Sequence, residues 1–141
     1  PAEQRRDPQR ARYIRYALAE DKILAILMKN PDYYEHAAQR IGLDGFVTDR
    51  NRALAKVLFE RLAAGQSVEL PLLSAQLDEE QMAAAAGLLN SISGLTFGPE
   101  DLDSYIDTLL SFKTVKSQDE VAAMTDDDLK AYIAALASKK K

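Results

Sequence analysis

The amino-acid sequence predicts an all-α protein, a multi-helix bundle followed by a C-terminal helical hairpin. Apolar residues recur every three or four positions in several segments, the spacing that places side chains on one face of a helix. No segment alternates between apolar and polar residues as a half-buried strand does, and the nearest candidate, residues 67–70, is too short. We expect three parts along the chain: a linker over 1–10, the bundle over 11–97, and the hairpin over 98–141, whose first helix is shared with the bundle.

The first long helix is expected to follow the linker and to end at Asn30. A polar gap over residues 20–22 interrupts its apolar stripe and allows either one bent helix or two short ones. The stripe consists of Ile14, Ala17, Leu18, Ile23, Leu24, Leu27 and Met28.

Cap and breaker residues mark the later helices. Pro31 suits the first position of a helix, and Gly42 is expected to end that helix in a left-handed conformation. Asp78 with Gln81 resembles a capping box. Further helices are expected to begin at Thr48 or Asp49, after Pro71, at Gly98-Pro99 and at Thr125.

The last helix has the clearest pattern. Thr125 can cap it, and three Asp at 126–128 occupy the first turn, where the helix dipole favours anions. Its apolar side chains follow at i, i+3, i+4 and i+7: Leu129, Tyr132, Ile133 and Leu136.

Composition narrows the possible chemistry. The 141 residues include no Cys and one His, which excludes thiolate chemistry, disulfides and Cys/His zinc sites and suits a cytoplasmic protein. No apolar run is long enough to span a bilayer. Because the chain begins at Pro1, we expect it to be a piece of a larger protein.

The charges are unevenly distributed around a net −4. Residues 66–112 hold eight acids and no Lys or Arg, which would repel phosphate, so little or no direct nucleic-acid binding is expected. Residues 1–30 hold seven Lys or Arg against four acids. The Arg cluster in that segment could touch DNA weakly, but a solvated linker entering a helix is the preferred interpretation.

Candidate catalytic residues are few. Asp101, Asp103 and the Asp at 126–128 suggest a two-metal nucleotidyl transferase, but both groups lie in first turns of expected helices, where capping explains them. His36 has no recognisable nucleophile nearby in sequence and is interpreted as a surface or boundary residue. We therefore expect a binding module that is not an enzyme, with no metal and no cofactor.

An interaction surface is the remaining possibility. The apolar stripe of the last helix either packs back on the bundle or is offered to a partner, and its residues alone leave both open. The candidate contact residues are Leu129, Lys130, Tyr132, Ile133, Leu136 and Phe112.

Two segments carry a family resemblance. The run AEDKILAILMKNP at 19–31 resembles the first bundle helix of the C-terminal domain of bacterial DNA primase, and Phe46 with TDRN at 48–51 resembles the next recurring segment. The N-terminal domain of the replicative helicase has a similar pattern and fold. The resemblance covers about residue 17 to the end, although the hairpin is short for the family and residues 117–120 could cap a new helix.

The resemblance implies a primosome component in DNA replication. Its function would be to dock primase on the hexameric replicative helicase and so couple priming to unwinding, with single-strand-binding protein as a possible second partner. The alternative is the helicase's own N-terminal collar, an oligomerisation domain. RNA synthesis and zinc binding would belong to other domains of the parent primase.

Overall fold

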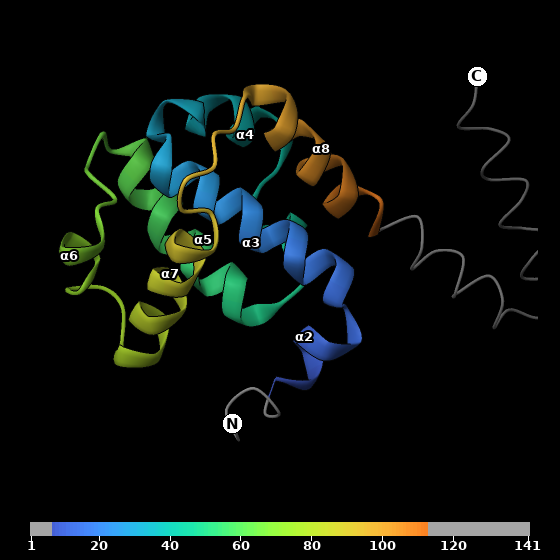
Figure 1. Ribbon diagram of the computed structural model, residues 1–141, viewed down its shortest axis with the longest axis horizontal. Coiled ribbons are helices and arrows are strands. Elements are labelled where there is room, and N and C mark those ends of the chain that lie inside the picture. Colours follow the sequence, from blue (N-terminus) through green and yellow to red (C-terminus); the bar gives the residue numbers. More distant parts are fainter. Residues whose placement is uncertain (1–6, 113–141) are drawn as a thin grey trace, which may run out of the picture. The chain divides into compact units, whose positions relative to one another are not determined.

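The centre of the fold is one long helix, α3 (Ile14–Lys29), in a computed structural model that describes residues 7–112. Ten of its sixteen residues are buried, so neighbours must cover it on several sides. Helices α5, α7 and α8 pack around it (Figure 1). The apolar run from Ile23 to Met28 is buried throughout, which explains why α3 is central and not a surface helix.

The start of the bundle differs from the prediction. A short helix, α2 (Pro8–Arg12), precedes α3, and the helical conformation is interrupted between them at Tyr13. Asp7 caps α2 by accepting a hydrogen bond from Arg10 N at 2.9 Å. The segment 20–22, which we expected to bend or divide the helix, lies inside continuous α3. It was misinterpreted as a gap because Glu20 is polar, yet Glu20 is completely buried.

Two residues of the predicted apolar stripe face outward. Ile14 is 47% exposed and Leu18 is 51% exposed, although Ala17 between them is buried. At this end of α3 the buried face is formed by Tyr16, Ala19 and neighbouring residues. Ile14 and Leu18, four residues apart, lie on the side that no other described helix covers.

The middle of the chain contributes two 3₁₀ turns, one short α-helix and one long α-helix. The 3₁₀ turn η1 (Pro31–Tyr33) leads into α4 (Tyr34–Arg40), and η2 (Leu43–Gly45) leads to α5 (Asp49–Ala63). Pro31 begins a helical turn as predicted. Gly42, however, is extended with φ −106°, so the expected left-handed exit is wrong. The positive φ lies instead at Gly65 (71°), just after α5.

Three helices complete the bundle: α6 (Leu70–Leu73), α7 (Glu79–Ser91) and α8 (Pro99–Leu110). The capping box at the start of α7 is confirmed, with Gln81 N donating to Asp78 Oδ1 at 2.8 Å and Asp78 N donating to Gln81 Oε1 at 2.9 Å. In α8, the apolar side buries Leu102, Ile106 and Leu109.

The all-α class is confirmed, since the described residues contain helices and no strand. One compact unit extends to Leu110 and therefore includes α8; residues from Ser111 onward belong to a second unit. Within residues 7–112 there is no helix that combines the length and the apolar character needed to cross a membrane.

Candidate functional site

The sequence-predicted contact residues are mostly beyond the part of the chain that the structure describes. Leu129, Lys130, Tyr132, Ile133 and Leu136 all lie outside residues 7–112. Phe112 is the one member of the set inside this range, and it is half-buried. The predicted contact surface therefore stays a prediction.

Of the aspartates considered as metal ligands, Asp101 and Asp103 have different partners, and those at 126–128 lie outside the described residues. Asp101 Oδ2 accepts a hydrogen bond from Gly98 N at 2.8 Å and so caps the start of α8. Asp103, two residues later, points toward α4 instead. Among residues 7–112 no group of three or more acidic or His side chains is close enough to hold a metal ion. The capping interpretation holds for Asp101, and Asp103 has a different role.

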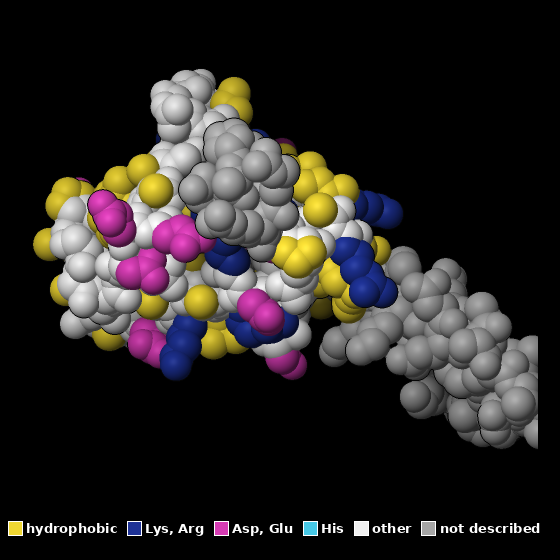
Figure 2. Space-filling view, turned by 90° about the horizontal axis from the view of Figure 1, so that it is seen from below, with side chains coloured by type: hydrophobic (Ala, Val, Ile, Leu, Met, Phe, Trp, Pro, Cys, Tyr) yellow, Lys and Arg dark blue, Asp and Glu magenta, His cyan; other side chains and the backbone are white. Residues whose placement is uncertain are grey.

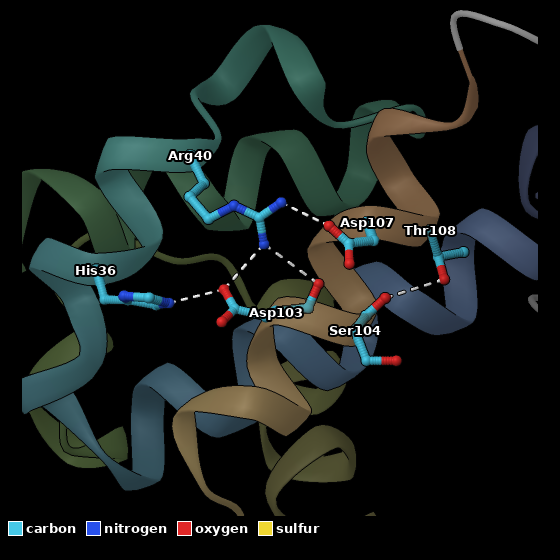
Figure 3. Close-up of polar contacts among 6 residues, drawn as sticks. All are labelled: His36, Arg40, Asp103, Ser104, Asp107 and Thr108. Atoms are coloured by element: carbon cyan, nitrogen blue, oxygen red, sulfur yellow. Dashed lines mark hydrogen bonds and ion pairs between the residues drawn. The ribbon is translucent and has the colours of Figure 1, made fainter.

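Asp103 belongs to a network that joins α4 to α8 (Figure 3). Its Oδ1 is 2.7 Å from His36 Nε2 and accepts a hydrogen bond from Arg40 at 2.8 Å. The other terminal nitrogen of Arg40 donates to Asp107 at 2.5 Å. His36 and Arg40 are four residues apart, as are Asp103 and Asp107, so each pair lies on one face of its helix and the two faces meet.

The side chains of this α4–α8 network are all partly exposed to solvent. The His36 and Arg40 side chains hold the pKa of the Asp103 carboxyl below its ordinary value, first through the hydrogen bond with His36. His36 is 43% exposed and Asp103 is 35% exposed. Figure 3 shows the Ser104 hydroxyl pointing away from the imidazole, so it does not complete a nucleophile–base pair. The arrangement fastens α8 to α4 and does not resemble a catalytic centre.

A second polar cluster is entirely buried and surrounds Glu20 of α3. Its carboxylate accepts hydrogen bonds from the backbone N–H of Val47, from Thr48 N at 3.2 Å and from Thr48 Oγ1 at 2.6 Å. Asn51 Nδ2 donates a further bond at 3.2 Å. These donors lie at the N-terminus of α5, where amides have no helical partner and the dipole favours an anion. Glu20 therefore caps α5 from another helix.

Next to this cluster is a cavity of about 510 Å³ with a mixed polar and apolar lining. In its wall Arg10 forms a bidentate salt bridge with the Asp21 carboxylate, with N–O distances of 3.1 and 2.5 Å. Asn51 Nδ2 donates to the same carboxylate at 3.0 Å. The hydrogen bonds raise the pKa of Arg10 above its ordinary value. The cavity is lined by Asp7, Arg10, Asp21, Arg50, Asn51, Ala84, Gly87 and Leu88.

Sequence reasoning missed both polar clusters. The signal for Glu20 was its position on the face that Tyr16, Ile23 and Leu24 bury, because an acid among such residues must find donors. The signal for the α4–α8 network was the matching i, i+4 spacing of its cationic and anionic pairs. Neither signal identifies the partner segment.

Comparison with known proteins gives no assignment. A scan against protein-family models, a search of curated proteins and a search of solved structures each found no match. The functional argument therefore depends on this chain's own residues.

Proposed function

We propose that this chain is the non-catalytic, cytoplasmic module by which a bacterial DNA primase docks on the hexameric replicative helicase. In this role it couples primer synthesis to unwinding within the primosome. The observation that carries the proposal is the resemblance of residues 19–31 and 46–51 to the helicase-binding domain of primase.

The two resembling segments are in contact with one another, which supports treating them as one pattern. Residues 19–29 lie in α3, where most of them are buried, and Phe46 is 1% exposed. Glu20, in the first segment, accepts hydrogen bonds from Thr48 and Asn51, in the second. The residues that carry the resemblance thus form the joint between α3 and α5, so the match concerns the framework of the bundle and not its surface.

The partner contact is proposed for the end of the chain. Interface energy is usually concentrated in a few aromatic and large apolar side chains, which favours Tyr132 among the apolar residues of the last predicted helix. Single-strand-binding protein is a possible second partner. The proposed helicase contacts are Leu129, Lys130, Tyr132, Ile133, Leu136 and Phe112.

The test is calorimetric titration of the chain into the replicative helicase of the same organism. The variant Tyr132→Ala/Leu136→Ala should lose binding while keeping the wild-type circular dichroism spectrum. Leu72→Ala, an exposed apolar side chain of α6, is the matched control and should bind like wild type.

Two results would redirect the proposal. If wild type does not bind the helicase and self-associates in the same buffer, the helicase collar becomes the better interpretation. Tight stoichiometric binding of Mg²⁺ or Mn²⁺ to the chain would favour the nucleotidyl-transferase interpretation.

A further inference from the structure

The beginning of α3 leaves an apolar row in solvent. Ile14 and Leu18 are about half exposed and stand one turn apart, while the helix further along is buried. Lys22 continues the same row at the next i+4 position and is half-buried. This exposed pair of large aliphatic side chains is a small apolar surface that another molecule can cover.

The segment that carries this row is also cationic. Arg12 and Arg15 are exposed, with guanidinium carbons 5.3 Å and 5.9 Å from the ring centroids of the tyrosines that follow them, and neither forms an ion pair with a described residue. Figure 2 shows Lys and Arg side chains beside hydrophobic ones on the right of the view, on the side where α2 and the start of α3 lie in Figure 1.

The nearby acids do not neutralise this charge. Asp7 caps α2, Glu20 is buried against α5, and Asp21 is paired with Arg10. Among the described residues of this segment, each carboxylate therefore already has its own donors, while three cations remain without an acid. A chain with net charge −4 thus presents a locally positive surface around two aliphatic anchors.

We propose that this cationic apolar face, formed by Arg12, Ile14, Arg15, Leu18 and Lys22, docks an acidic amphipathic helix of a partner protein. Two anchors one turn apart match the i, i+4 apolar spacing of such a helix, and the flanking cations match carboxylates beside its stripe. A protein helix fits better than nucleic acid, because phosphate contacts use the cations but leave the aliphatic side chains in water. None of these five residues belongs to the helicase contacts proposed at Phe112 and beyond, so different variants test the two proposals.

The probe for this surface is a synthetic amphipathic peptide with a Leu stripe flanked by Glu. We expect it to bind the full 141-residue chain and to shift backbone amide resonances mainly within residues 11–22. The same peptide with Lys replacing Glu should not bind, because it places cations against cations. Binding of the Lys peptide with equal affinity would overturn the proposal.

Variants locate the site. Leu18→Gln and Arg15→Glu should each weaken binding of the acidic peptide about tenfold, which corresponds to ~1.4 kcal/mol. Leu72→Gln and Lys56→Glu change an exposed apolar and an exposed cationic residue on other helices, α6 and α5, and should leave affinity unchanged. Equal losses in the control variants would overturn the assigned location.

Two further ligands separate a protein partner from other anions. A single-stranded oligonucleotide and vesicles containing anionic lipid are titrated into the same chain at the same ionic strength. Weaker binding of both than of the peptide supports the proposal. It is overturned if the oligonucleotide binds more tightly and Leu18→Gln has no effect on that binding, or if the vesicles bind more tightly than the peptide.

Discussion

The two polar clusters of the bundle use similar groups in opposite surroundings. Around Glu20, one carboxylate accepts bonds from two backbone amides, a hydroxyl and a side-chain amide, with no water access to the side chain. In the α4–α8 network, two carboxylates meet an imidazole and a guanidinium, and all four side chains are at least 31% exposed. The first cluster has less formal charge pairing but far more burial.

Burial decides which cluster stabilises the fold more. Donors around Glu20 have no solvent to replace a lost acceptor, so removing the carboxylate leaves them unsatisfied. Donors around Asp103 can turn to water at little cost. We therefore expect the α3–α5 joint to set the stability of the bundle, and the α4–α8 joint to adjust how α8 is held.

Glu20→Ala should have the largest effect. It removes four hydrogen bonds and leaves buried amide donors without partners, which should lower the free energy of unfolding by about 3 kcal/mol. Urea unfolding followed by circular dichroism measures this loss. The control Glu35→Ala removes an exposed carboxylate of α4 and should change stability little. Similar losses in the two variants would show that burial is not the deciding factor.

Thr48→Val tests one bond of the buried cluster while keeping the shape of the side chain. The lost hydroxyl leaves Glu20 Oε1 with Asn51 as its remaining donor, so we expect a loss of about 1 kcal/mol in the same unfolding experiment. Thr96→Val changes an exposed threonine and serves as the control. An unchanged midpoint for Thr48→Val would mean that the buried carboxylate is held by its other donors alone.

A double-mutant cycle with Arg40→Ala and Asp103→Ala measures the exposed network directly. The coupling between the two side chains should be a small fraction of the Glu20→Ala effect, because solvent screens the pair. It should shrink further when NaCl is raised from about 0.05 M to about 0.5 M. Coupling as large as the Glu20 effect, and insensitive to salt, would contradict the comparison.

The smallest effect expected is a pH dependence from Asp103. Its pKa is lowered in the folded chain, chiefly by the hydrogen bond with His36, so the folded state binds this proton more weakly than the unfolded state. The contribution is complete above the ordinary Asp value of 3.8 and is lost as pH falls through the lowered value. The stability difference between wild type and Asp103→Asn should therefore shrink between about pH 5 and about pH 2. A difference that grows on acidification would reverse the assigned sign.

The fold could be predicted where local chemistry decides it. Pro31 and the Asp78–Gln81 box mark helix ends through their own backbone and side-chain preferences, and these helix ends were predicted correctly. The break at Tyr13 and the exposure of Ile14 and Leu18 could not be predicted, because both depend on which face of α3 the other helices cover. The periodicity of apolar residues identifies the apolar face of a helix. It does not identify the residue at which neighbouring helices stop covering that face.

The polar clusters were unpredictable for a related reason. Glu20 and Thr48 are separated by twenty-eight residues, and His36 and Asp103 by sixty-seven, so nothing in either local segment indicates the partner. Glu20 was interpreted as part of a polar gap, because acids are rarely buried unless they are paired. The contact residues expected beyond Phe112 stay a prediction.

The central place of α3 also affects how the chain is made. Its apolar residues leave the ribosome about seventy residues before α8, which covers part of them. Until α8 has emerged, a nascent bundle exposes aliphatic surface that chaperones or other unfinished chains can bind. A translational pause before Pro99 should therefore reduce the yield of folded protein more than one after Leu110.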